Sequence, residues 1–417
     1  MTRVRNSRTA LAAVLALVGC GPMAGRRGAT VMFASGADLQ SINPLLTLHP
    51  LAHQVQRYVL FTTLVRYDSA MQVEPYLARS WQWSADHRRL TFTLHADLRW
   101  HDGRPTTAHD AEWTLNAARD SVTGYPRYQD VRNLQRVSAP DDTTLVLTFR
   151  DPQRAVPDVL TDLAILPEHL LGNTSHGELR RAPFNEHPVG NGPFRFVSHE
   201  ANRRWVFQRN DSFPASLGGA PKLERFIVVV VDEPATKLAA LSSGELDFAG
   251  IQPAHAAFVR RDPDLAVVSY PLLFTYGIVF NTRHPPFDQL AVRRAVSDAL
   301  DREEIVNGYL FGFGTPAWGP VPEGAPGRLE EGRESRVTSR EAARPETRDS
   351  RPSFQLLTVG SGEAALEQLV QAQLARAGFE VHIRQMELSA FLDRVYGPSH
   401  DFDAAVLGVP GDPGLGY

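Results

Sequence analysis

The sequence has one cysteine, little net charge and no apolar run long enough to cross a bilayer. A single cysteine excludes a disulfide framework and a cysteine-based zinc site within one chain. A nucleic-acid partner would call for a strongly basic face, and the formal net charge of −4 over 417 residues gives no electrostatic case for one. The apolar run at residues 10–18 is far short of the ~20 residues that span a membrane.

That short run has the form of an export signal. Arg3, Arg5 and Arg8 precede it, and it has the length of a signal-peptide core. The following Leu-Val-Gly-Cys20 resembles the bacterial lipobox. An ordinary cleaved signal with an incidental cysteine is the alternative. We predict a lipoprotein signal at residues 1–20, lipid attachment at Cys20 and a tether at 21–30. Because one acyl chain binds membranes only marginally, several chains are expected. The mature chain would lie in the periplasm or cell envelope, outside the inner membrane.

Sequence motifs of the commoner enzymes are also missing. There is no Gly-x-Ser-x-Gly, no phosphate loop ending in Gly-Lys-Ser/Thr, no His-Glu-x-x-His and no EF-hand loop, which argues against the commoner hydrolases and NTPases. Asp401, Asp403 and Asp412 are grouped enough for acid–base chemistry, although a solvated loop explains them equally well. The interpretation is that the protein is not an enzyme and needs no cofactor.

Two histidines have the spacing of a metal-binding pair. His49 and His53 are four residues apart, as in helical zinc ligands. However, Pro50 suits the first turn of a helix, so His49 falls just outside that helix. A capping or exposed role is favoured, and no metal site is predicted.

The residues that are present predict a strand, a turn and a capped helix in the first third of the chain. Leu90, Phe92 and Leu94 alternate with threonines, which is typical of a half-buried strand. Asp102-Gly103 is a turn signal. Thr107 and Asp110 have the spacing of a capping box and precede a helical pattern.

Strands and helices alternate along the rest of the chain, which predicts an α/β protein. Strands are expected at 31–34, 144–149, 205–209, 226–231, 277–281, 354–359 and 380–385. Helices are expected from Pro50, from Pro234 with Leu238 and Leu241 facing inward, at 287–300, at 301–310 with Asp301 and Glu304 as a capping box, and at 364–377. The last of these helices lies between two strands, as in a βαβ unit. The charged stretch 328–351 has few large apolar residues, so we predict a disordered surface insertion there.

The stretch Arg-Trp-His-Asp-Gly-Arg-Pro-Thr-Thr-Ala-His-Asp at 99–110 resembles a family signature. It is similar to the Phe-His-Asp-Gly-x-Pro-x-Thr-Ala-x-Asp pattern of family 5 extracellular solute-binding proteins, the peptide- and nickel-type receptors of ABC importers. Further segments resemble the family in the same order, at 42–46, 64–68, 188–196, 237–247, 280–288 and 314–322. Several ordered matches are far more specific than any single one.

The resemblance implies a two-lobe periplasmic-binding-protein type 2 fold with an extra subdomain in lobe one. Lobe one would comprise 31–49 and 182–269, the extra subdomain 50–181, and lobe two 270–417. The ligand, a peptide or related small solute, would be trapped as the lobes of this monomer close. The closed form would then dock on the permease and ATPase subunits of an importer.

The resemblance also implies where ligand is held. In the peptide receptors, the segment after an early Asn-Pro loop and a Gly-Trp-x-x-Asp motif of lobe two contact the peptide. The corresponding residues here are Thr47, Leu48, His49, Gly408, Val409, Pro410 and Asp412. Asp412 would hold the peptide ammonium group. An aromatic wall could be lost because Val409 replaces the tryptophan, and Pro410 lacks an N–H. Trp318 or Tyr276 could supply that wall.

Two other functions stay open at this stage. A receptor of the same fold could bind a metal chelate or a sugar, with His49, His53 or Trp318 as contacts. An exported hydrolase would use Asp401 and Asp412. The family pattern continues beyond Asp412, whereas this sequence stops at Tyr417. We therefore expect either a fragment or a truncated paralogue, with a strand edge left unpaired.

Overall fold

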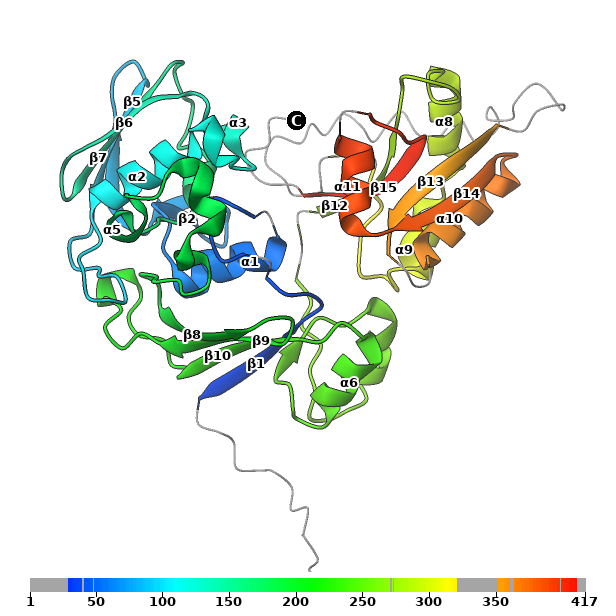
Figure 1. Ribbon diagram of the computed structural model, residues 1–417. Coiled ribbons are helices and arrows are strands. Elements are labelled where there is room, and N and C mark those ends of the chain that lie inside the picture. The colour runs from blue at the N-terminus through cyan, green and yellow to red at the C-terminus, as the bar shows by residue number, and fades with distance from the viewer. Residues whose placement is uncertain are drawn as a thin grey trace, which may run out of the picture.

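The computed structural model describes residues 29–320 except 40, 48, 271 and 273, and residues 352–410 except 361–363 and 398. Figure 1 shows two bodies, joined by the stretch between α7 (Ala256–Val259) and β12 (Phe274–Phe280). The predicted signal, the insertion at 328–351, Leu48 and Asp412 all lie outside the described residues.

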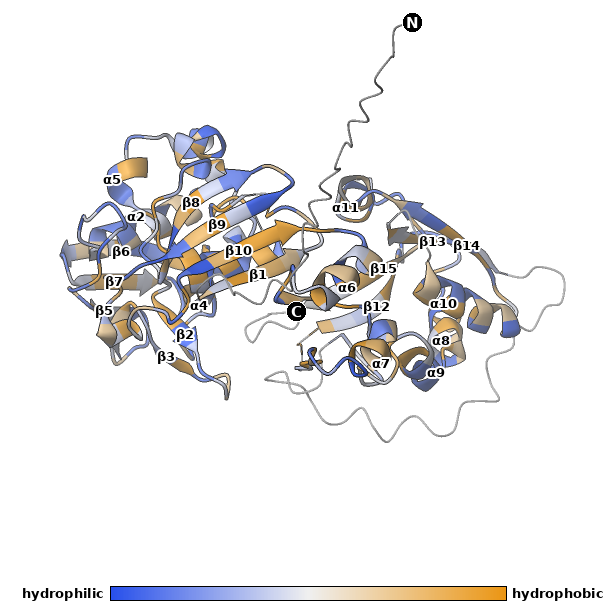
Figure 2. Ribbon diagram, turned by 90° about the horizontal axis from the view of Figure 1, so that it is seen from below, coloured by the Kyte–Doolittle hydropathy of each residue, from blue (hydrophilic) through white to orange (hydrophobic). Residues whose placement is uncertain are grey.

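The first body is built on a five-stranded sheet with the order β11-β1-β10-β9-β8. Its strands are β1 (Thr30–Ser35), β8 (Phe194–Glu200), β9 (Arg204–Arg209), β10 (Arg225–Val230) and β11 (Phe248–Ala249). β1 runs parallel to both β10 and β11, whereas β9 is antiparallel to its neighbours β10 and β8. The central strands are hydrophobic along most of their length, as Figure 2 shows. This suits strands that are covered on both faces.

A second sheet packs in the same body, with the order β4-β5-β7-β6. Its strands are β4 (Ala78–Trp83), β5 (Arg89–Leu94), β6 (Leu134–Asp141) and β7 (Thr144–Phe149), and β2 (Val65–Tyr67) pairs separately with β3 (Val73–Pro75). Leu90, Phe92 and Leu94 are at most 2% exposed, because alternate side chains of a strand share one face. One apolar core runs without a break from Leu39 to Val228, so both sheets share it.

Short helices connect these strands. They are α1 (Pro50–Val55), a π-helical turn η1 (Gln56–Leu60), α2 (Ala108–Ala118), η2 (Ser121–Thr123), α3 (Tyr128–Val131), α4 (Val159–Asp162), α5 (Glu168–Leu171), η3 (His176–Arg181), η4 (Pro183–Asn185), η5 (Ala215–Leu217), α6 (Pro234–Ser242), η6 (Pro253–His255) and α7.

The second body has a four-stranded sheet in the order β12-β15-β13-β14. β13 (Ser353–Val359), α10 (Ala365–Arg376) and β14 (Glu380–Met386) form the predicted βαβ unit, with the two strands parallel. β15 (Ala404–Pro410) pairs antiparallel with β12. The other helices are α8 (Leu290–Ala299), α9 (Arg302–Gly308) and α11 (Leu388–Tyr396). In both ribbon views, β12 and β15 lie on the side of this body nearer to the first one.

The predicted strands and helices are confirmed within the described residues, apart from two details. Asp301 caps α9, because its carboxylate accepts from the backbone N–H of Glu304. The expected capping box is wrong, however, since the Glu304 side chain binds Gln373 and Arg376. No residue of α6 is buried, so the two leucines predicted to face inward are only half-buried.

Candidate ligand-binding site

The family-like stretch at 99–110 is held together by its own polar groups. Thr107 and Asp110 form the predicted capping box of α2. Asp110 also accepts from the indole N–H of Trp100 at 3.2 Å and from the backbone N–H of Glu168 at 2.9 Å. Burial raises the pKa of Asp110, against the opposing effect of these donors. Because all three donors come from the protein, Asp110 is a structural residue.

The turn of the same stretch is fastened to a second family-like segment. The backbone N–H of His101 donates to the carbonyl of Gly190 at 2.7 Å, and its Nε2 donates to the carbonyl of Gly192 at 3.0 Å. Burial lowers the pKa of His101 to about 4. The Nε2 of His169 lies 2.7 Å from a carboxylate oxygen of Asp102. The interpretation of His101 and Asp102 as turn architecture agrees with these contacts.

Glycine is required where that second segment crosses the π-helical turn. A Cβ added to Gly190 would lie 1.9 Å from the carbonyl oxygen of Leu60. The adjacent Asn191 is fully buried and accepts from the backbone N–H of Thr62 at 2.9 Å. The two family-like segments therefore pack against each other and against the end of the π-helical turn.

The segment 41–49 lies beside a pocket of about 340 Å³. Ser41, Leu46, Thr47, Arg180 and Asn185 line it. Thr47 is 5% exposed, and its hydroxyl oxygen accepts from the backbone N–H of His49 at 3.0 Å. Among the described residues, the exposed Arg180 has no ion pair within 4 Å. The pocket therefore offers one guanidinium group to an anionic partner.

A larger pocket of about 470 Å³ lies along the loop 152–159, beside Arg127 and Asp130. These two side chains pair with each other at 2.6 Å. Because Thr47, which the family resemblance places at the ligand, lines the smaller pocket, we take the smaller one as the candidate site.

The other predicted contacts come together at β12 and β15. Tyr276 stands opposite Gly408 in the antiparallel pair, and Phe274 stands opposite Pro410. The rings of Phe274 and Tyr276 meet edge to face at 5.1 Å, and both are exposed, at 42% and 55%. A Cβ on Gly408 would lie 1.9 Å from the Phe274 ring. The Phe274 ring thus occupies the space that a side chain at Gly408 would fill.

The remaining predicted residues are placed only in part. Val409 pairs with Thr275 through the backbone, but its side chain and that of Pro410 lie outside the described residues. Trp318 is 44% exposed, and the guanidinium of Arg302 lies 4.5 Å above its ring. The position of Asp412 relative to Gly408 stays a prediction.

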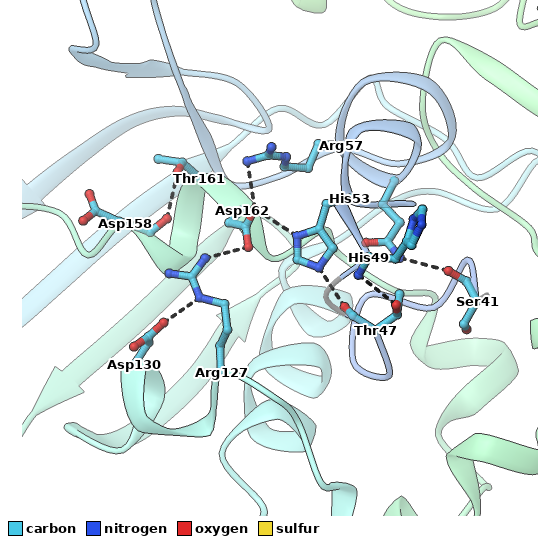
Figure 3. A network of polar contacts seen from close by, with 11 residues as sticks. Ser41, Thr47, His49, His53, Arg57, Arg127, Asp130, Asp158, Thr161 and Asp162 are labelled. Atoms are coloured by element: carbon cyan, nitrogen blue, oxygen red, sulfur yellow. Dashed lines mark hydrogen bonds and ion pairs between the residues drawn. The ribbon is translucent and has the colours of Figure 1, made fainter. Parts of the chain in front are cut away.

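A polar network in the first body joins α1 to the segment 41–49 (Figure 3). His49 caps α1, because its Nδ1 accepts from the backbone N–H of Ala52 at 3.3 Å. The Nε2 of His53 donates to the carbonyl of Thr47 at 2.7 Å. Its Nδ1 lies 3.4 Å from Asp162, which also pairs with Arg57 and Arg127 at 2.8 and 2.7 Å.

These contacts weaken the two alternatives for chemistry. His49 and His53 are engaged in protein hydrogen bonds, and no cluster of three potential ligands is found among the described residues. Asp401 is exposed and pairs with Arg394 at 3.2 Å, while Asp403 accepts from the backbone N–H of Gln355 at 2.8 Å. Asp412, the partner of Asp401 in the hydrolase alternative, lies outside the described residues.

Residues 72–416 match the family described as bacterial extracellular solute-binding proteins, family 5. The chain belongs to this family. Its members are binding proteins, so the protein binds a solute and is not an enzyme. The family acts outside the cytoplasm, and no helix among the described residues could span a membrane.

Relatives and solved structures agree with this assignment. A putative ABC transporter peptide-binding protein of Brucella ovis is 28% identical over 366 residues, covering 85% of this chain and 68% of the relative. The oligopeptide-binding protein AppA of Bacillus subtilis is 25% identical over 372 residues, covering 84% and 68%. The structure of AppA with a nonapeptide has a TM-score of 0.79 at 23% identity and covers 91% of this chain and 79% of that one. This structural match shows the two-lobe periplasmic-binding-protein fold.

Sequence reasoning missed three parts of the candidate site. Arg180 lies in an unremarkable Leu-Arg-Arg stretch and meets Thr47 only through the fold. Asp162 is 109 residues from His53, so no local pattern links them. Phe274 could have been found from the sequence. In Phe-Thr-Tyr at 274–276 two aromatic residues alternate with a threonine, which places both aromatic side chains on one face of a strand.

Proposed function

We propose that this solute-binding protein is the receptor of an ABC importer and that its ligands are oligopeptides. Relatives at 28% and 25% identity carry peptide-binding names, which supports a peptide over a sugar. The observation that carries the proposal is the pocket at Thr47, whose single charged lining group is Arg180. A peptide offers a carboxylate to that group and a main chain to the segment 47–49.

The proposed site has one half on each body. On the first body, Thr47, Leu48 and His49 contact the peptide main chain, and Arg180 pairs with a ligand carboxylate. On the second body, the end of β15 from Gly408 to Pro410 faces the peptide. Asp412 binds its ammonium group, a charge-assisted bond that contributes ~1.5–3 kcal/mol.

Exposed aromatic rings replace the missing tryptophan in this proposal. Phe274 and Tyr276 stand beside Gly408 with large exposed fractions. Aromatic side chains bury large areas at little entropic cost when they bind a partner. The two rings form the aromatic surface against which the ligand packs. Trp318, whose ring is covered on one side by the guanidinium of Arg302, contributes a further ring.

The proposed division follows the two bodies. Lobe one comprises 31–49 and 182–269 with an extra subdomain at 50–181, and lobe two begins at 270. The lobes close around the peptide by bending of the stretch that joins α7 to β12, and the closed monomer docks on the permease and its ATPase subunits.

The proposed location is the outer side of the inner membrane. Residues 1–20 act as a lipoprotein signal, and Cys20 carries the lipid anchor. Expression in a bacterial host with a labelled fatty acid tests this proposal. Label in the wild type that disappears in Cys20→Ala supports it, and an unlabelled wild type contradicts it.

Ligand capture is tested by calorimetry and thermal unfolding with the chain from residue 21 onward. A mixed library of di- to nonapeptides, Ni²⁺ with histidine, and a panel of sugars are added separately. We expect saturable heat and a raised Tm with peptides only, because a ligand at 100 times its Kd stabilises by ~2.7 kcal/mol. A response to the nickel complex or to sugars without one to peptides would contradict the proposal.

A further inference from the structure

Arginine side chains gather at one end of the second sheet, β4-β5-β7-β6. At this end, Trp83 at the end of β4 stands opposite Leu90 on β5, and the end of β7 stands opposite the starts of β5 and β6. The topology therefore brings three separate stretches of the chain together here. These stretches carry six exposed arginines, which we call the arginine patch: Arg88, Arg89, Arg132, Arg136, Arg150 and Arg154.

Three members of the arginine patch surround one threonine on the outer face of the sheet. Thr148 on β7 stands opposite Arg89 on β5 and opposite Arg136 on β6, so the three side chains lie on one face. Because neighbouring strands are about 4.8 Å apart, the backbones of the two arginines are about 10 Å from each other. Arg150 follows Thr148 by two residues, and alternation along the chain directs it towards the same face.

Carboxylates do not neutralise the arginine patch. None of its six members forms an ion pair with an acidic side chain among the residues that the structure describes. Arg88 donates to the backbone carbonyl of Arg150 at 2.6 Å, and Arg132 donates to a glutamine side chain at 2.9 Å. The adjoining carboxylates are Asp86, which accepts from the backbone N–H of Arg88 at 3.2 Å, and the exposed Asp151. Six guanidinium groups beside two carboxylates leave an excess of positive charge, in a chain whose formal net charge is −4.

Other acidic groups of this part of the fold are engaged or lie elsewhere. Asp130 and Asp158 share the larger pocket with Arg154. However, Asp130 pairs with Arg127 at 2.6 Å, and Asp158 accepts from a tyrosine hydroxyl. The two aspartates at 141–142, where β6 turns into β7, lie at the opposite end of the sheet. The second sheet is therefore positive at one end and negative at the other.

The arginine patch suits a layer of anionic headgroups better than a protein surface. No large apolar side chain of β4, β5, β6 or β7 is exposed, whereas the centres of protein interfaces are rich in aromatic and apolar anchors. Guanidinium groups bind phosphate oxygens through paired N–H···O bonds. Both ribbon views place this sheet on the side of the first body that is away from the second (Figures 1 and 2). A membrane bound there leaves the space between the two bodies accessible to a ligand.

We propose that the arginine patch binds the phosphate groups of anionic phospholipids and orients the receptor on the membrane surface. One acyl chain binds membranes only marginally, so the patch acts as a further attachment beside the proposed anchor at Cys20. The attraction is electrostatic, and each arginine close to an anionic surface raises the affinity about five-fold. Binding to phospholipid does not require the anchor, so it can be measured without it.

The test measures co-sedimentation of the chain from residue 21 onward, which contains every described residue, with lipid vesicles. The vesicles consist of phosphatidylcholine alone or with phosphatidylglycerol as about two fifths of the lipid, each at low and at high salt. The patch variant combines Arg89→Gln, Arg136→Gln and Arg150→Gln. The control variant changes the net charge equally at three exposed arginines elsewhere, Arg181→Gln, Arg261→Gln and Arg294→Gln.

We expect the wild type to bind the phosphatidylglycerol vesicles at low salt and to be released at high salt. The control variant should bind within about three-fold of the wild type, and the patch variant at least about thirty-fold more weakly. Equal Tm values of the three proteins exclude a loss of fold.

Equal binding of the patch and control variants would overturn the proposal, as would equal binding of the wild type to both kinds of vesicle. A wild type that binds no vesicle also overturns it. In that case, binding to purified permease subunits that only the patch variant loses would assign the arginine patch to an acidic protein surface. None of these outcomes depends on peptide binding or on lipid attachment at Cys20.

Discussion

The motif region and the ligand region of this protein use their polar groups in opposite ways. The motif region consists of residues 99–110 and 188–196, and the ligand region of the segment 41–49 with Arg180, Phe274, Tyr276 and Gly408. In the motif region, Asp110 and Asn191 are buried and bound by protein donors. In the ligand region, a guanidinium group and two aromatic rings are exposed. The most recognisable residues thus build the fold, and the residues available to a ligand carry no strong sequence signal.

The comparison predicts its largest effect at Gly190. Gly190→Ala would place a Cβ 1.9 Å from the backbone carbonyl of Leu60, and backbone cannot move aside as a side chain can. We expect a loss of about 3 kcal/mol or more in the free energy of unfolding, measured by urea denaturation. Gly250→Ala is the control, because nothing lies within 4 Å of a Cβ there. Equal stability of the two variants would show that the motif region is not tightly packed.

The next effect is a pH dependence of stability that comes from His101. Its pKa of about 4 in the folded state lies below the ordinary value of 6.5, so between these values the unfolded chain binds more protons. Stability is therefore lost as pH falls from 6.5 towards 4, by about 2 kcal/mol at pH 5. Urea denaturation at pH 8 and pH 5 measures the loss. His101→Gln should reduce this difference by about that amount, and an unchanged difference would mean that His101 becomes charged in the folded protein.

A smaller effect on affinity, with none on stability, is expected at Arg180. Arg180→Ala should weaken binding of a peptide with one free carboxylate about five-fold, because an exposed ion pair contributes ~1 kcal/mol or less. It should leave the amidated form of the same peptide unchanged. Arg181→Ala is the matched control, since Arg181 is exposed next to it and does not line the pocket. Equal losses of affinity for the free and the amidated peptide would show that Arg180 does not bind the ligand carboxylate.

The same contrast explains how far the sequence could predict the structure. The alternation at Leu90, Phe92 and Leu94 and the capping pair of Thr107 and Asp110 are local, so β5 and α2 followed from them, whereas β4 and β6 of the same sheet were not predicted. Pro50 likewise placed His49 at the cap of its helix. The meeting of Asp162 with His53, 109 residues apart, depends on how α4 packs on α1. Periodicity encodes which face of an element is buried, but not which distant element covers it.

The smallest effect on stability, and the most specific to the ligand region, is expected at Gly408. The three atoms nearest to a Cβ there all belong to the far end of the Phe274 ring, which is 42% exposed and can rotate into solvent. Alanine also lowers the entropy of the unfolded chain, so the free energy of unfolding should change by less than about 0.5 kcal/mol. Peptide affinity should nevertheless fall about three-fold, because the displaced ring leaves the wall beside Tyr276.

Calorimetry on Gly408→Ala and Gly277→Ala separates this effect from a general disturbance of the strands. Gly277 lies on β12 opposite Leu407, with nothing within 4 Å of an added Cβ. Both substitutions alter one strand of the same pair, yet only that at Gly408 moves the Phe274 ring. If the two variants bind peptide equally well, the ring beside Gly408 is not part of the ligand wall. A loss confined to Gly408→Ala places the ligand against the edge of the second body at β12.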